Sequence, residues 1–455
     1  MMKRLLSFGV CAVGCALLWV GPAAGTAVAA GFQVLTAGKV VRLENRGDPM
    51  KNGGTVMVGA DRALQALFDP TCPVTSAIEV EAYLQSTYRD AVLAHVDLDC
   101  AKWSANGTGF RYVDPAGTVR SIRYGRSGLR IEVRGAGFTP IDGPVGFVQA
   151  QLQIGDQTLR ARFHNFKQND SQRVVSRRPS AAAAAGEAGF WDVLTGDDDS
   201  EAKEQEVIAN LETAARRDRR DGRSRFLLGM THLYRAGQRV TRFDDVTAEA
   251  RAELAAANAS FTDALPLLWD DASGSGDSRV PGFAAAAKYL LGFVEHDATL
   301  QAQGLADLDR AVQVNSFFNV FDLIPVLQAL PPGDPVFQQA YASFTTYLSD
   351  PETLQCVVTQ PELCADAGFA PRNVQGSLTL FGDLYAKAGS LQPARVWYNL
   401  AAGLSDTPTW HFASIIQDRV ATAATRVALY KDSDPTNDPP MIGAGTEACA
   451  VCHRR

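Results

Sequence analysis

The chain has 455 residues, of which 46% are hydrophobic and 20% charged, and its formal net charge is −7. This composition is typical of a globular protein with more than one core, and it excludes a fibrous or fully disordered chain. The excess of acidic residues argues against nucleic acid or an anionic membrane as the main partner.

The first 30 residues predict a secretory signal peptide. Lys3 and Arg4 precede an apolar run that ends at Val20, and small residues follow at Ala27 and Ala29, which is the layout of an export signal with a cleavage site. The run is shorter than the roughly 20 residues that cross a bilayer, so we expect no membrane span after cleavage. The prediction is an exported protein, periplasmic or extracellular, of a Gram-negative type of cell.

Residues 31–166 predict an all-β sandwich or small barrel. Short runs of alternating apolar and polar residues are separated by turns rich in Gly and Pro. Around Ile131 and Val133, for example, apolar residues alternate with Arg130, Glu132 and Arg134, which is the period of a strand with one buried face.

The cysteines predict two disulfides and single out a third pair. Two of the eight lie in the signal peptide, and the other six form three local pairs. In an exported protein such pairs favour disulfides, so we expect Cys72 to pair with Cys100 and Cys356 with Cys364. The third pair, Cys449 and Cys452, has a histidine directly behind it.

The chain changes character after residue 166. Residues 167–200 are polar, then rich in alanine, then acidic, and predict a linker. Residues 201–430 have a helical period, and acidic residues at 197–199 suit the start of the first helix. This part is expected to form short helical hairpins.

The stretch from Ser377 resembles a tetratricopeptide repeat. Seven residues match the positions of its two helices: Leu378, Phe381, Gly382, Tyr385, Ala394, Tyr398 and Ala401. Fainter copies surround Gly292 and Gly229, at spacings that exclude a regular array. The resemblance implies an irregular α-helical, tetratricopeptide-like solenoid whose concave face binds a protein partner.

Residues 431–455 predict a flexible tail that carries the motif C-x-x-C-H. The tail begins with a segment rich in Pro and Gly. Cys449, Cys452 and His453 then follow in a spacing whose chance occurrence is on the order of two in a thousand for this composition.

The motif resembles the haem-attachment signature of c-type cytochromes. The resemblance implies one covalent haem c, with thioether links to Cys449 and Cys452 and with His453 as the proximal iron ligand. Only two residues follow His453, so the resemblance does not extend to the usual single-haem fold. For the distal ligand we consider Met441, His411 or a group from outside the chain.

Two other interpretations of the tail remain open, a small disulfide or thiol redox pair and a zinc site that would need a fourth ligand. Nothing else in the sequence resembles a catalytic motif, so we expect no enzyme. The function predicted is electron transfer or redox sensing through the haem, with a redox protein partner chosen by the helical repeats. The alternative is a non-haem scaffold for protein–protein interaction, in which the tail cysteines form a disulfide or metal clip.

Overall fold

The structure is a computed structural model of the whole chain. It describes residues 32–455 except 62–63, 65–67, 85–88, 142, 165, 241–245, 350–357, 359–369, 371, 433, 443–449 and 455. The predicted signal peptide and the predicted Cys356–Cys364 disulfide therefore lie outside the described residues, and so does Cys449.

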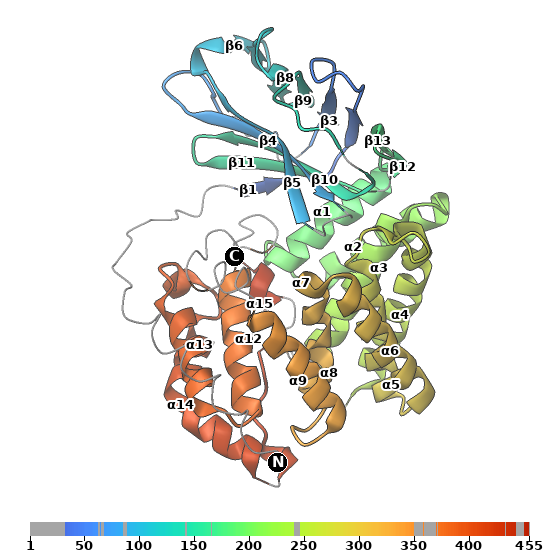
Figure 1. Cartoon of the computed structure of the whole chain (residues 1–455), viewed down its shortest axis with the longest axis vertical. Helices are drawn as coiled ribbons and strands as arrows, with labels where there is room; N and C mark the ends of the chain where they lie inside the picture. Colours follow the sequence, from blue (N-terminus) through green and yellow to red (C-terminus); the bar gives the residue numbers. More distant parts are fainter. Residues whose placement is uncertain are drawn as a thin grey trace, which may run out of the picture.

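The N-terminal region contains two β-sheets (Figure 1). The first has the strand order β1-β11-β10-β4-β5, and its pairs are antiparallel except for β1 with β11. Its strands are β1 (Phe32–Val34), β4 (Ser76–Leu84), β5 (Arg89–Leu98), β10 (Val145–Ile154) and β11 (Gln157–Phe163).

The second sheet is antiparallel throughout, with the order β12-β13-β2-β3-β9-β8-β7-β6. Its strands are β2 (Val40–Glu44), β3 (Gly53–Val58), β6 (Trp103–Asn106), β7 (Gly109–Val113), β8 (Val119–Gly125), β9 (Gly128–Arg134), β12 (Phe166–Asn169) and β13 (Arg173–Ser176).

The two sheets share one hydrophobic core. In β9, Ile131 and Val133 are buried in this core while Arg130 and Arg134 are exposed, which confirms the alternation predicted for this strand. A hydrogen bond joins the two sheets, and a disulfide closes the loop that contains the hairpin β4–β5. The Trp103 indole donates a hydrogen bond to Ser76 Oγ at 3.0 Å, and Cys72 forms a disulfide with Cys100, the partner predicted.

A helical region follows the sheets. Its longer helices are α1 (Ala181–Thr195), α2 (Glu201–Arg217), α3 (Gly222–Arg239), α4 (Ala248–Leu268), α5 (Val280–Val294), α6 (Ala298–Val314), α9 (Pro335–Leu348), α12 (Asn373–Lys387), α13 (Leu391–Gly403) and α14 (Ala413–Lys431). Short helices are α7 (Ser316–Asn319), α8 (Ile324–Ala329) and α15 (Ala450–His453), and β14 (Trp269–Asp270) pairs with β15 (Ser275–Gly276). Among the described residues, no helix has the length and apolar character needed to cross a bilayer.

The stretch that resembles a tetratricopeptide repeat forms the helix pair α12–α13. Leu378, Phe381 and Tyr398 are fully buried. A Cβ atom on Gly382 would lie 2.3 Å from the Tyr398 ring, so glycine allows the two helices to cross closely. The packing expected for this pair is therefore present.

The predicted linker 167–200 is wrong. Most of it is ordered secondary structure: β12, β13 and helix α1, which begins after the N-cap residue Ser180. Helix α1 packs closely on α2, because Gly186 and Gly189 leave room for the side chains of Leu211 and Val207. In Figure 1, α1 lies between the sheets and the remaining helices.

Buried charges join α1 to both regions. Lys39, directly before β2, donates hydrogen bonds to Glu187 on α1 at 2.5 Å and to the Arg162 carbonyl at 2.9 Å. Arg223 on α3 lies 3.5 Å from the other oxygen of Glu187. Burial opposes ionisation of Glu187, but the charges of Lys39 and Arg223 hold its pKa below the ordinary value. The carboxylate is therefore shared between the sheets and the helices.

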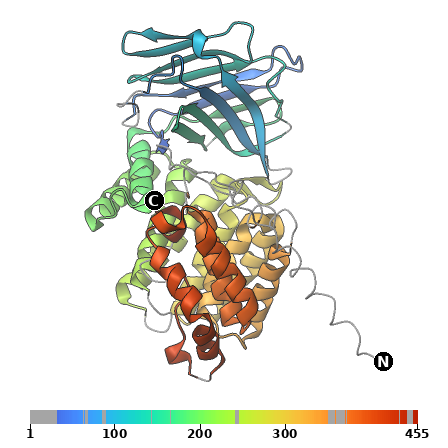
Figure 2. The same cartoon turned by 90° about the vertical axis from the view of Figure 1, so that its left-hand side faces the viewer.

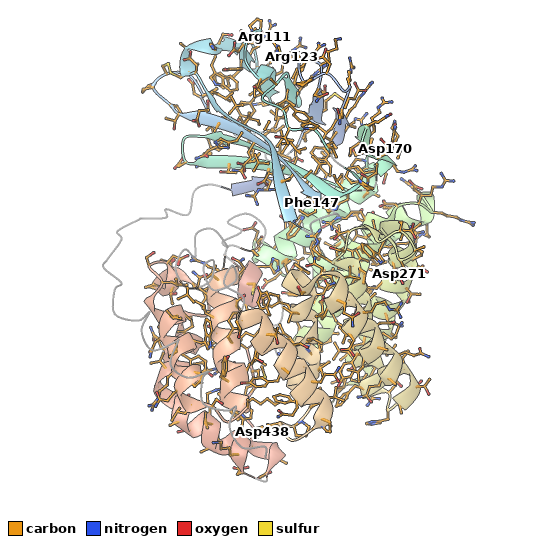
Figure 3. All side chains as sticks on the ribbon, viewed as in Figure 1. Arg111, Arg123, Phe147, Asp170, Asp271 and Asp438 are labelled. Carbon is orange, nitrogen blue, oxygen red and sulfur yellow. A yellow bond between two sulfur atoms is a disulfide. The ribbon has the colours of Figure 1, made fainter. Side chains whose placement is uncertain are left out.

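His164 lies beside Phe147, with 5.9 Å between the ring centroids, and Figure 3 shows Phe147 where the sheets meet the helices. The guanidinium carbons of Arg162 and Arg279 lie 4.6 Å and 4.8 Å from the centroid of the Phe147 ring. His164 is 8% exposed, and its Nε2 atom has no hydrogen-bond partner among the described residues. Burial lowers the pKa of His164 well below 6.5, and Arg223 and the other nearby cations lower it further.

This shift predicts a loss of stability in mild acid. Below pH 6.5 the unfolded state takes up a proton on His164 that the folded state does not, so the free energy of unfolding falls by about 1.4 kcal/mol per pH unit. We expect His164→Gln to flatten the dependence of the urea midpoint on pH between about 5 and 6.5. The exposed His296, whose φ of 53° tolerates asparagine, provides the control His296→Asn. If the urea midpoint of His164→Gln depends on pH as steeply as that of wild type, protonation of His164 is not the cause of the loss of stability.

Candidate functional site

The C-terminal turn α15 is part of the folded helical region. It packs between the N-terminal part of α12 and helix α1, as Figures 1 and 2 also show. Val451 is 6% exposed and belongs to the hydrophobic core of the helices. The turn therefore has a defined position.

Cys452 faces α12. Its carbonyl oxygen accepts a hydrogen bond from the Arg372 backbone N–H at 3.0 Å. Its sulfur packs against Gly376, where a Cβ atom would come within 2.5 Å of Sγ. Cys452 is thus half-buried against the backbone of α12.

His453 and Arg454 face α1. The His453 imidazole lies 6.4 Å from the Trp191 ring, measured between centroids, at an interplanar angle of 44°. The Arg454 guanidinium forms an ion pair with Asp199, just beyond the end of α1. Arg455 lies outside the part of the chain that the structure describes. The turn therefore directs neighbouring residues to two different helices.

The flexible tail predicted for residues 431–455 is wrong for the described residues 434–442 and 450–454. Met441 and Ile442 are 4% and 1% exposed. The Ile442 backbone N–H donates to Asp383 on α12 at 2.6 Å, and the Pro440 carbonyl accepts from Arg426 at 2.7 Å. The segment packs because its backbone groups find buried partners, although its composition is typical of a tether.

The two candidates for a distal ligand lie in different places. Met441 is buried next to Ile442, whose backbone N–H binds Asp383 on α12. Asp383 is seven residues beyond Gly376, the residue that contacts Cys452, which is a rise of about 10 Å along the helix. His411 is exposed and follows the short helix η6 (Thr407–Thr409).

Hydrogen bonds connect the segment that precedes His411 to the motif. Arg372 donates its backbone N–H to Cys452 and its guanidinium to Thr409 Oγ1 at 3.0 Å. His411 thus belongs to the same end of the helical region as the motif, whereas Met441 lies two turns of α12 away.

The residues of the turn fit a covalent haem in their chemistry and restrict where it can lie. Cys452 supplies a cysteine sulfur, and His453 supplies an imidazole beside the Trp191 ring. A porphyrin cannot lie between α15 and α12, because Cys452 already contacts the backbone there.

Among the described residues, no group of three or more His, Cys, Asp or Glu side chains could hold a metal ion. Cys449, which the zinc interpretation requires, is not one of them.

The sequence does not indicate which residues receive the turn: Trp191, Asp199, Arg372 and Gly376. Trp191 and Asp199 fall in the predicted linker, where an aromatic residue and an acidic cluster were the available signals. Nothing in the sequence pairs them with residues more than 250 positions later.

No protein-family model matches the chain, and neither a curated protein nor a solved structure matches it.

Proposed function

We propose that this protein is an exported carrier of one covalent haem c that serves electron transfer or redox sensing. Cys449 and Cys452 would bind the haem through thioether links, and His453 would be the proximal iron ligand. When bound, such a haem supplies reversible one-electron oxidation and reduction of iron. The C-x-x-C-H motif carries the proposal, and the position of the His453 ring beside Trp191 on α1 supports it.

In this proposal, the residues around the turn have distinct roles. Trp191 packs beside the His453 ring and limits its orientation. Arg454 is placed at the surface by Asp199, where its guanidinium suits a carboxylate such as a haem propionate. The helical region, with its tetratricopeptide-like pair α12–α13, would select a redox protein partner.

A second candidate is a non-haem scaffold for protein–protein interaction, in which the tail cysteines form a disulfide or metal clip. The packing of Val451 and Cys452 favours it, because these contacts fill the space beside α12 without any cofactor. The clip would hold the C-terminal turn against the helices.

Haem attachment is tested by expressing the exported protein with a cytochrome c maturation system. We expect the intact mass to rise by one haem and the pyridine haemochrome spectrum to show thioether-linked haem. Cys449→Ala and Cys452→Ala should each remove a thioether link, which shifts the haemochrome band. An unmodified mass would reject the haem and leave the clip, whose zinc form is then tested by elemental analysis.

Two histidine variants separate ligation from attachment. His453→Ala should keep the added mass but change the optical spectrum, because the proximal ligand is lost. The matched variant His411→Ala changes the spectrum only if His411 is the distal ligand, and Met441→Leu tests the other candidate in the same way.

A further inference from the structure

The charge of the chain is divided unevenly between its two regions. Residues 32–178, which contain the two sheets, have 19 Lys and Arg against 14 Asp and Glu, a net charge of +5. Residues 179–455 have 22 against 36, a net charge of −14. The overall charge of −7 therefore conceals a cationic β region, and it does not exclude an anionic partner for that region.

Three arginines lie side by side on the outer face of the larger sheet. Arg111 on β7 is directly opposite Arg123 on β8, and Arg123 is directly opposite Arg130 on β9. All three are exposed, and none forms an ion pair with another described residue. Like charges directly opposite each other destabilise a sheet, so the fold gains nothing from this row.

Apolar side chains lie beside this row. Met57 on β3 is directly opposite Arg130 and is 37% exposed. Val113, two residues after Arg111 on the same face of β7, is also 37% exposed. Met50, 60% exposed, lines a neighbouring cleft of about 420 Å³.

The same cleft adds further positive charge. Its lining includes Arg120 and Arg134 together with the single acid Glu132. We call the surface formed by Arg111, Arg123, Arg130, Met57 and Val113 the arginine face. In Figure 3, Arg111 and Arg123 lie at the end of the molecule remote from the helices.

We propose that the arginine face docks on an anionic phospholipid surface. Arginines neutralise the headgroups, and exposed methionine and valine side chains enter the boundary between headgroups and acyl chains. A dissolved polyanion would use the arginines but gains little from the apolar residues. The acidic helical region would be repelled from the same surface, so the molecule should bind with its β region towards the lipid and its C-terminal turn away from it.

The test is co-sedimentation of the full mature protein with lipid vesicles. The protein can be used either with or without attached haem. Vesicles of phosphatidylcholine alone are compared with vesicles that also contain phosphatidylglycerol, at low and at physiological salt. We expect binding only to the anionic vesicles and weaker binding at higher salt. The triple variant Arg111→Gln/Arg123→Gln/Arg130→Gln should bind on the order of 100-fold more weakly.

A matched variant makes the same change of charge elsewhere. Arg217, Arg219 and Arg220 are exposed residues at the end of α2 and the turn after it, and changing all three to Gln should leave vesicle binding unchanged. The arginine-face variant should melt at the wild-type temperature or higher, because repulsion between strands is removed. A folded triple variant that still binds like wild type would overturn the proposal.

A further variant distinguishes lipid from other polyanions. Met57→Gln should weaken vesicle binding several-fold but leave binding to a single-stranded oligonucleotide or a polyuronate unchanged. Binding to those polymers without binding to anionic vesicles would reject the lipid assignment, as would equal binding to neutral and anionic vesicles. Neither result depends on haem attachment, so this proposal and the proposed function fail independently.

Discussion

Replacing Asp383 with alanine is expected to lower the free energy of unfolding of the helical region by about 3–5 kcal/mol. Asp383 on α12 is fully buried and accepts hydrogen bonds from four groups. The donors are the Tyr398 hydroxyl at 2.6 Å, Arg419 Nε at 3.1 Å, Arg426 Nη2 at 3.0 Å and the Ile442 backbone N–H at 2.6 Å. This carboxylate thus joins α12 to α13, α14 and the segment before the C-terminal turn.

The large effect has a specific cause. Without the carboxylate, the Arg419 and Arg426 side chains, 9% and 5% exposed, lose the counterion that they share in the interior and keep the Pro440 carbonyl as a common acceptor. Removing one partner of a buried ion pair costs more than the pair itself contributes. Asp383→Asn keeps the shape and should cost less than alanine.

The neighbour Asp418 supplies the control. It also contacts Arg419, at 3.2 Å, but its side chain is 54% exposed, so Asp418→Ala should cost less than about 1 kcal/mol. Urea unfolding followed by far-UV circular dichroism measures both variants. Equal midpoints for the two would show that the buried network contributes nothing.

Loss of the Cys72–Cys100 disulfide is expected to destabilise the β region by about 3–4 kcal/mol. The bond closes a loop with a sequence separation of 28 around the hairpin β4–β5. In the chain-entropy account, a loop of this length restricts the unfolded chain by that amount. Strand β5 is at the edge of its sheet, so the hairpin should become the first site of proteolysis when the bond is absent.

The measurement compares wild type with Cys72→Ala/Cys100→Ala, each with and without a thiol reductant. Reductant should lower the urea midpoint of the wild-type β region and leave the double variant unchanged. The signal of the helical region provides an internal reference. A double variant as stable as oxidised wild type would contradict the prediction.

The parts of the fold that sequence predicts are those set by local periodicity. Alternation around Ile131 predicts a strand with one buried face, and the spacing of Leu378, Phe381 and Tyr398 predicts a pair of packed helices. Both signals depend on residues a few positions apart, so they hold without knowledge of the partner surface.

The failures arise where distant residues supply the partners. The alanines of α1 resemble a linker in composition, and their helix is fixed by Leu211 and Val207 on α2. The prolines before the motif resemble a tether, but the carbonyls of Pro439 and Pro440 accept hydrogen bonds from α14. A proline lacks the N–H donor yet keeps its acceptor, and composition alone does not indicate whether a donor is near.

The candidate site divides in the same way. The motif Cys449, Cys452 and His453 is visible in five consecutive residues, whereas its neighbours Trp191 and Gly376 become neighbours only through the packing of α15. The arginine face also needs the sheet register, since Arg111, Arg123 and Arg130 are 12 and 7 positions apart in the sequence.

Helix α1 has a mechanical consequence for the whole molecule. Through Glu187 it is fixed to the sheets and to α3, and from its last turn Trp191 contacts the C-terminal turn. A helix of 15 residues is a stiff rod about 22 Å long. A displacement of the C-terminal turn would therefore reach the β region as a rotation of this rod, and the two ends of the molecule should tumble in solution as one body.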